Sequence, residues 1–283
     1  MIEIELKFTG AESDNGYLNF YDAARALAGF ERSLALTTHL VLNGEIITQS
    51  PSLRGAEIYL PHIEEGSWKA RAVVALSAAS VILSAGKDSP LGQVVTSVYD
   101  YALSETMGFH PDYDKTLQQQ YHEHLKEKGI SKEKLDSLAE KIEPSVAEMH
   151  RPLAITRTAF SAQILATQKL IRLGPEMSLS TYEYVKQTIK EDETVDIVGV
   201  VTSYNLNTFK GRFLVFEEHR PIPFELTEGA RNKRNVAALT SSQHFHGQDR
   251  KDPRAALKLK ARRLVSTTGR LKRLHVSGAE RAA

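Results

Sequence analysis

The stretch VDIVGVVTSYNLNTFKGRFLVFE, residues 195–217, decides the predicted fold of the last third of the chain. Its first part, Val195–Tyr204, is rich in β-branched residues, which is typical of a strand. Gly199 within that strand indicates a bulge or a tight bend of the kind that barrels need. The polar Asn205–Gly211 predicts a turn, and Arg212–Glu217 predicts the returning strand.

Three more strands and a helix are predicted after this hairpin. Pro221–Leu226 predicts a third strand whose prolines suit a sheet edge. Thr227 is expected to cap a helix that runs to about Ser242. Ala256–Val265 and Arg270–Val276 predict a final hairpin. The order strand, strand, strand, helix, strand, strand is that of the OB-fold, a five-stranded Greek-key barrel.

This element order, together with the stretches GVVTSYN…KGRF and TTGRLKRLHV, resembles OB-like domains. The chain also resembles uncharacterised bacterial proteins that end in such a barrel after an α+β region. Some of those proteins occur on mobile elements or beside defence genes. In the OB-fold, the face of strands two and three and the loops after strands one and four bind oligonucleotides or oligosaccharides. The resemblance implies a binding module and carries over no catalytic residue.

The usual binding face of that fold corresponds to twelve candidate nucleic-acid-binding residues in this chain. The first loop and the last hairpin supply them: Tyr204, Asn205, Asn207, Phe209, Lys210 and Arg212, then Lys258, Lys260, Arg262, Arg270, Lys272 and Arg273. Single-strand binders combine a cationic groove with aromatic faces for the bases. Tyr204 and Phe209 are the aromatics expected to stack on bases. The alternatives are a merely solvated surface for the basic residues and a core position for Phe209.

The charge is distributed unevenly along the chain. From Gly229 to Ala283 there are 14 Lys and Arg against 3 Asp and Glu, whereas residues 1–228 carry 22 against 32. Such segregation predicts that the C-terminal region contacts something anionic. The partner could be nucleic acid, a membrane surface, or the acidic region of another copy in an oligomer.

Residues 1–76 predict an α+β unit made of a strand, a long helix and a hairpin. The first strand is indicated by the alternation in Ile2–Phe8. Asn19 is expected to cap a helix of about 22 residues that ends at Asn43–Gly44. The hairpin pairs Ala56–Leu60 with Trp68–Val74. The predicted apolar stripe of the helix consists of Phe20, Ala23, Leu27, Phe30, Leu34 and Val41.

Residues 77–190 are expected to be mainly helical. The predicted helices span Ser89–Met107, Ser131 to about Ile142 with an interruption at Pro144, Phe160–Leu173, and Thr181–Lys190 capped by Ser180. Lys190–Thr194 is charged and predicts a linker. The fold class is therefore α+β, with a domain over 1–190 and an OB-like barrel over 194–283.

Several function classes lack their signature in this sequence. The absence of cysteine removes disulfides, thiolate zinc sites and cysteine nucleophiles, and it fits a reducing cytosol. A phosphate-binding loop is rejected because Val81 and Asp88 stand where it needs glycine and Ser or Thr. The apolar run Ala72–Ala85 is shorter than the roughly 20 residues of a membrane-spanning helix. We expect no signal peptide, no cofactor and no metal site.

The leading hypothesis is a non-enzymatic binding or assembly protein of the bacterial cytosol whose barrel contacts nucleic acid. One alternative is a structural homo-oligomer, or a complex subunit, in which the basic barrel docks on the acidic body of a neighbour. A second alternative is a hydrolase. Because no G-x-S-x-G or H-E-x-x-H motif is present, its site would consist of Asp, Glu and His residues that are dispersed in the sequence.

Overall fold

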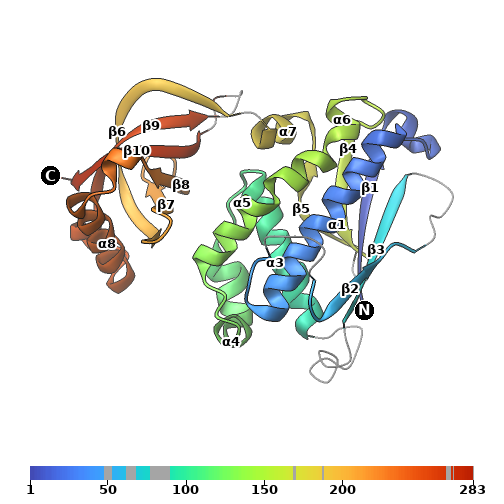
Figure 1. Cartoon of the computed structure of the whole chain (residues 1–283), viewed down its shortest axis with the longest axis horizontal. Coiled ribbons are helices and arrows are strands. Elements are labelled where there is room, and N and C mark those ends of the chain that lie inside the picture. The colour runs from blue at the N-terminus through green and yellow to red at the C-terminus, as the bar shows by residue number, and fades with distance from the viewer. Residues whose placement is uncertain are drawn as a thin grey trace. The chain divides into compact units, whose positions relative to one another are not determined.

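The computed structural model describes residues 1–47, 53–61, 68–76, 90–167, 170–186, 188–265, 269 and 271–282. Two compact units make up the chain, Met1–Lys186 and Gln187–Ala283, and each is described by itself (Figure 1). Arg270, Val81, Asp88 and most of the run Ala72–Ala85 lie outside the described residues. The fold class is α+β, as the sequence predicts.

The N-terminal unit contains a five-stranded antiparallel sheet in the order β2-β3-β1-β4-β5. Figure 1 shows α1, α3 and α5 packed together on one side of this sheet. The elements are β1 (Ile2–Thr9), α1 (Phe20–Asn43), β2 (Ala56–Tyr59), β3 (Lys69–Leu76), α3 (Pro90–Thr106), α4 (Gln119–Glu127), α5 (Lys132–Met149), α6 (Arg151–Ala154), β4 (Ser161–Ala166), β5 (Ile171–Met177) and α7 (Leu179–Lys186). Short helical turns span Ala11–Asn15 and Asp114–Gln118.

Strand β1 lies at the centre of the sheet and confirms the predicted alternation. Its apolar residues Ile2, Ile4, Leu6 and Phe8 are all buried. Leu6 pairs with residues of both neighbouring strands, β3 on one side and β4 on the other. The predicted hairpin of β2 and β3 is also present, because the two strands pair antiparallel.

Helix α1 begins and ends where the sequence predicts. The Asn19 side chain accepts a hydrogen bond from the backbone N–H of Asp22 at 3.2 Å, and Gly44 has the left-handed conformation with φ 69°. The membership of Phe20 in the buried stripe is wrong, because its side chain is 89% exposed. The spacing of apolar residues identifies the apolar face of a helix, but it does not show which part of that face is covered by other elements.

The predicted helix over Phe160–Leu173 is wrong, since these residues contribute to the hairpin of β4 and β5. The physical reason is tertiary. Strand β1 offers β4 a full ladder, from Ile4↔Ala166 to Thr9↔Ser161, which local helix propensity does not outweigh. Within β4, Ala162 and Ile164 are buried, so the segment also alternates.

Three smaller expectations in this region also need correction. Helix α5 continues through Pro144, which is exposed and therefore keeps its ring away from the core. The cap of α7 is Ser178 and not Ser180, because the N–H of Thr181 donates to the Ser178 hydroxyl at 3.4 Å. Lys190–Thr194 is no linker, because it belongs to strand β6.

The C-terminal unit is a closed five-stranded barrel in the order β10-β8-β7-β6-β9, which is the OB-like connectivity. Strands β10 and β8 are parallel and the other pairs are antiparallel. The elements are β6 (Ile189–Asn205), β7 (Lys210–Val215), β8 (Arg220–Leu226), α8 (Lys233–Gln248), β9 (Leu257–Val265) and β10 (Leu271–Arg281), with short helical turns at Glu228–Ala230 and Pro253–Ala255.

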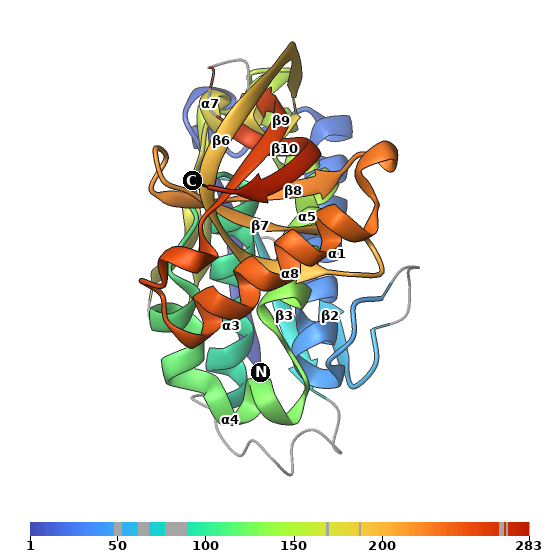
Figure 2. The ribbon, with the colours of Figure 1, turned by 90° about the vertical axis from the view of Figure 1, so that its left-hand side faces the viewer.

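Strand β6 is long and curved in Figure 2. Gly199 marks the point where it changes partners. Residues before Gly199 pair with β9, residues after it pair with β7, and Gly199 itself pairs with both. A side chain there would collide with the backbone oxygen of Leu214. The bend that Gly199 predicts is therefore the point at which the barrel closes.

Helix α8 covers one end of the barrel, and its predicted start at Thr227 is wrong. Asn232 is the cap, since its side chain accepts from the N–H of Asn235 at 3.0 Å. The Ser242 hydroxyl accepts from the N–H of Val201 at 3.0 Å and donates to the carbonyl of Ala255. It thereby satisfies a β6 amide beside the register shift between Val201 and Ser203.

We expect Gly211→Ala to destabilise the barrel by about 1–3 kcal/mol through overpacking. A Cβ at Gly211 would lie 2.7 Å from a ring carbon of Phe224 and would collide with the Ser203 carbonyl. Urea denaturation followed by circular dichroism measures the loss. Gly229→Ala is the matched control, because no atom lies within 4 Å of its added carbon. Equal midpoints for the two variants would contradict the packing described for Gly211.

His150 joins α5 to α7 inside the N-terminal unit. Its side chain is buried, its Nδ1 donates to the carbonyl of Val146 at 2.7 Å, and its Nε2 contacts the Thr181 hydroxyl at 2.8 Å. Burial lowers the pKa of His150 from 6.5 to about 4, although the backbone hydrogen bond opposes this shift. The folded unit therefore holds this histidine in its neutral form.

Because the unfolded chain binds a proton at His150 more readily than the folded chain, acid should favour unfolding. We expect the free energy of unfolding to fall by about 3 kcal/mol from this group as the pH drops from 6.5 to about 4. Urea titrations across this pH range measure it. The variant His150→Gln should be less stable at pH 7 and should lose this part of the pH dependence. An unchanged pH dependence in the variant would assign the effect to other groups.

Candidate nucleic-acid interface

The turn between β6 and β7 has the position that the sequence predicts. The Asn205 side chain accepts hydrogen bonds from the N–H groups of Asn207 at 2.9 Å and Thr208 at 3.2 Å, which shapes the turn. Asn205 and Asn207 are exposed, and Lys210 is half-buried. Polar side chains of this turn are thus available to solvent.

Tyr204 lies in the barrel core, so its expected role as a surface stacking platform is wrong. It is 7% exposed, and its ring stacks on Phe224 with centroids 5.9 Å apart and planes at 9°. Gly211, its partner on β7, leaves room for the two rings. The register shift between Val201 and Ser203 changes which residues of β6 point inward, which a strict alternation does not reveal.

The ring of Phe209 already has a cationic partner within the barrel. The Arg231 guanidinium lies 5.1 Å from the ring centroid, and Arg231 also pairs with Glu225 at 3.4 Å. Phe209 is half-buried and packs against the core, in agreement with the core position given above as its alternative. Arg212 is 4% exposed, so its expected surface position is wrong as well. The two aromatics and Arg212 therefore do not form an open groove.

The strand pairing joins Lys210, at the end of the turn, to the basic residues of β9 and β10. Lys210 pairs with Glu225, Glu225 pairs with His275, and His275 pairs with Arg262. In the ring of strands, β9 is adjacent to β6 and β10 but not to β7 or β8. Lys260 and Arg262 on β9 are exposed, and Arg273 on β10 is half-buried. Lys272 is 8% exposed, with its Nζ 3.1 Å from the Thr188 hydroxyl, so its expected surface position is wrong. Lys210 and Arg262 thus belong to one row of paired residues around the barrel, whereas Tyr204, Arg212 and Lys272 are buried.

Lys258 is the most strongly paired of the β9 cations. Its Nζ lies 2.9 Å from Glu280 and 3.5 Å from Asp196, on the two neighbouring strands. The hydrogen bond with Glu280 raises the pKa of Lys258, and the same bond lowers the pKa of Glu280. Lys258 therefore links β9 to its two neighbouring strands, and its charge is partly neutralised by Glu280 and Asp196.

The site prediction missed two residues of this surface, His275 and Lys190. His275 pairs with Arg262 across the β9–β10 ladder and is half-buried. Burial lowers the pKa of His275, and the charges of Lys190 and Arg273 lower it further, against the opposing effect of Glu225. Lys190 was hidden in the predicted linker, whereas His275 stands two residues after Arg273, which is the spacing of one strand face.

These observations define a basic face of the barrel on the neighbouring strands β9 and β10 and the start of β6. Figure 2 shows the course of these three strands. Acidic groups also lie along these strands: Asp196 and Glu280 contact Lys258, and Glu225 pairs with His275. The basic face consists of Lys190, Lys258, Lys260, Arg262, Arg273 and His275.

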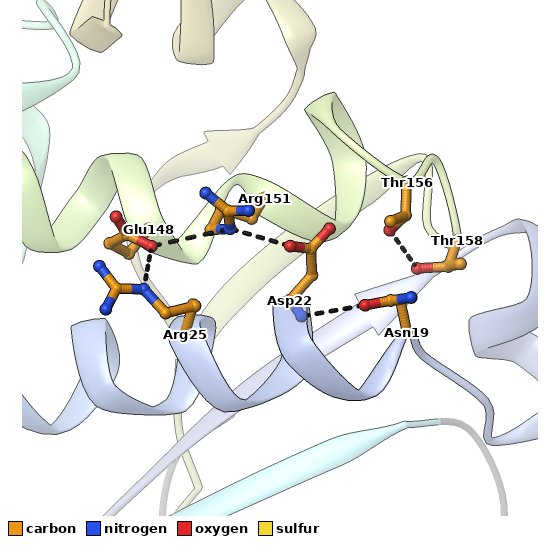
Figure 3. Close-up of polar contacts among 7 residues, drawn as sticks. All are labelled: Asn19, Asp22, Arg25, Glu148, Arg151, Thr156 and Thr158. Carbon is orange, nitrogen blue, oxygen red and sulfur yellow. Dashed lines mark hydrogen bonds and ion pairs between the residues drawn. The ribbon is translucent and has the colours of Figure 1, made fainter.

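The N-terminal unit has its own charged network, where α1 meets α5 and α6 (Figure 3). Arg25 donates to Glu148 at 2.9 Å, and Arg151 donates to the buried Asp22 at 2.8 Å. The Arg151 Nε also lies 3.7 Å from Glu148, so the four groups form one row of alternating charge. The hydrogen bond from Arg25 lowers the pKa of Glu148. The network is internally neutral and fixes the start of α1.

Within the described ranges, no cluster of three or more His, Asp or Glu could hold a metal ion. Nor does any helix in the described part of the chain have the length and apolar character needed to cross a membrane.

Two protein-family models match most of the chain. Residues 4–185 match the model described as Domain of unknown function (DUF7946). The chain belongs to this family. Residues 193–280 match a second model, Family of unknown function (DUF7947), which corresponds to the barrel. No curated protein and no solved structure matched the chain.

We expect Lys190→Gln to raise the pKa of His275, because it removes the neighbouring cation with the larger effect on that histidine. A pH titration of the His275 ring signals by NMR measures this shift. Lys126→Gln removes the same charge from an exposed position in the other unit and should leave the His275 titration unchanged. A pKa that stays the same in Lys190→Gln would remove Lys190 from the basic face.

Proposed function

We propose that the chain is a non-enzymatic binding and assembly protein of the bacterial cytosol whose barrel contacts nucleic acid. The observation that carries this proposal is the basic face, where Lys190, Arg262 and Arg273 surround His275 on a barrel of OB-like connectivity. The resemblance to bacterial proteins encoded on mobile elements or beside defence genes supports a role in such a system.

The charge of each unit supports the same proposal. The barrel unit, Gln187–Ala283, carries 18 Lys and Arg against 11 Asp and Glu, whereas Met1–Lys186 carries 18 against 24. Cationic groups that neutralise phosphates release counterions, and this release drives binding without regard to base sequence. The barrel is the unit with the charge suited to that interaction.

Contacts with the phosphate backbone fit this surface better than base stacking does. Tyr204 stacks on Phe224 and Phe209 is covered by Arg231, so both rings are engaged within the barrel. Phosphate contacts position a protein on nucleic acid but do not read sequence. We therefore propose binding that depends strongly on salt and little on sequence.

The test is a pair of charge-matched double variants. Lys260→Gln with Arg262→Gln removes two exposed cations of the basic face, and Lys126→Gln with Lys141→Gln removes two exposed cations of the N-terminal unit. Fluorescence anisotropy with random-sequence duplex DNA, single-stranded DNA and RNA measures affinity at several salt concentrations. We expect the barrel variant to lower the slope of log K against log salt on duplex DNA by about 2, at roughly 0.9 per phosphate contact.

The control variant should keep the wild-type slope. Absence of binding by the wild-type chain to all three nucleic acids at low salt would exclude this function. Equal losses in the two double variants would instead show a general charge effect and would remove the basic face from the proposal.

A second candidate function rests on the opposite net charges of the two units. The basic barrel of one copy would dock on the acidic unit of a neighbour, since complementary charge fixes partners and register. A nucleic-acid-free assembly that dissociates as salt is raised would favour this candidate over nucleic-acid binding.

A further inference from the structure

Helix α1 presents an apolar face that no described part of the N-terminal unit covers. Phe20 is 89% exposed and Tyr21 is 61% exposed, although both begin a helix whose later residues are deeply buried. Ala24 and Ala28 are exposed on the same side, one and two turns further on, and Leu27 is half-buried between them. This set, Phe20, Tyr21, Ala24, Leu27 and Ala28, is called the outer face of α1.

The opposite side of α1 already has its partner. Gly29 lets α5 approach so closely that an added carbon would collide with the Ser145 carbonyl. Asp22 and Arg25 are held by Arg151 and Glu148, as Figure 3 shows. The outer face is therefore held in a fixed orientation before any partner binds. Large exposed aromatic residues on a rigid helix are typical of protein interfaces.

We propose that a second copy of this chain occupies the outer face of α1, with the two helices antiparallel about a two-fold axis at Ala24. In that arrangement a residue four positions before Ala24 faces a residue four positions after it. Phe20 thus lies over the small Ala28 of the copy, and Ala24 lies beside its own equivalent. Tyr21 and Leu27, three positions either side, also meet. The face therefore complements itself in size, large against small.

The charges beside this face also suit an identical partner. Arg25, Glu148, Arg151 and Asp22 are paired within their own chain, so the approach of a second copy brings no unpaired like charges together. The Tyr21 ring lies 5.2 Å from the Arg151 guanidinium and shields it. Because the charges of this network are already paired with one another, the network does not favour a strongly charged partner.

Light scattering coupled to size-exclusion chromatography tests the proposal. At about 0.5 M salt the Debye length is a few Å, so charge-driven docking of barrels and nucleic-acid binding are both suppressed. We expect the wild-type chain to show twice its mass of 31.5 kDa under these conditions. Phe20→Asp should show the mass of one chain with an unchanged circular dichroism spectrum, because the side chain is exposed. Leu206→Asp, at an exposed position in the barrel turn, should keep the double mass.

Disulfide trapping tests the geometry, because the chain contains no cysteine. Ala24→Cys should form a covalent dimer on mild oxidation, since the two-fold axis brings this residue to its own copy. Ala237→Cys, an exposed alanine on α8, is the control and should stay monomeric. Phe20→Cys and Ala28→Cys should link when mixed, but Phe20→Cys alone should not.

A wild-type chain that has the mass of one copy in about 0.5 M salt overturns the proposal and leaves the outer face to a different protein. Trapping of Ala24→Cys no better than Ala237→Cys overturns it too. Linkage of Phe20→Cys to itself would show a parallel pair and overturn the antiparallel arrangement. Nucleic-acid binding is a separate readout, so the failure of one proposal does not decide the other.

Discussion

Closure of the C-terminal barrel depends on one strand, β6, which serves two partners in succession. Its first part pairs with β9 and its last part with β7, and Gly199 stands where the partners change. The backbone of Leu214 passes so close to Gly199 that an added Cβ would collide with the Leu214 carbonyl oxygen. With β6 bent at this point, β10 can complete the ring by pairing with both β9 and β8. A barrel closed in this way has no free edge along β9.

The position of the basic face depends on that closure. Because β9 lies between β6 and β10, its outward cations Lys260 and Arg262 share a surface with Lys190 and His275. The same ring connects them to Lys210 at the β6–β7 turn, because Lys210 and His275 both pair with Glu225. Phosphate contacts suit a surface of this kind, because they need cations at a suitable spacing and no stacking partner.

The N-terminal unit depends in a similar way on its central strand β1, which carries β3 on one edge and β4 on the other. Helices on one side of the resulting sheet bury the apolar residues of β1. Helix α1 is locked to α5 by the contact at Gly29 and by the row of charges in Figure 3. Its outer face is left exposed by this arrangement, and the apolar stripe read from the sequence extends onto it at Phe20.

The sequence alone determined the α+β class, the OB-like order of the barrel elements, the limits of α1 and the concentration of basic charge near the C-terminus. Each of these depends on local periodicity, on caps such as Asn19, or on composition, all of which are properties of neighbouring residues. Only the tertiary structure decided that Phe160–Leu173 contributes to a hairpin, because the free edge of β1 supplies its hydrogen bonds. It also decided that Tyr204, expected on the usual binding face of the OB-fold, points inward, since a register shift in β6 interrupts the alternation of that strand. Likewise, the joining of Lys190 to His275 and Arg262 required the closed ring, which brings together strands that are distant in sequence.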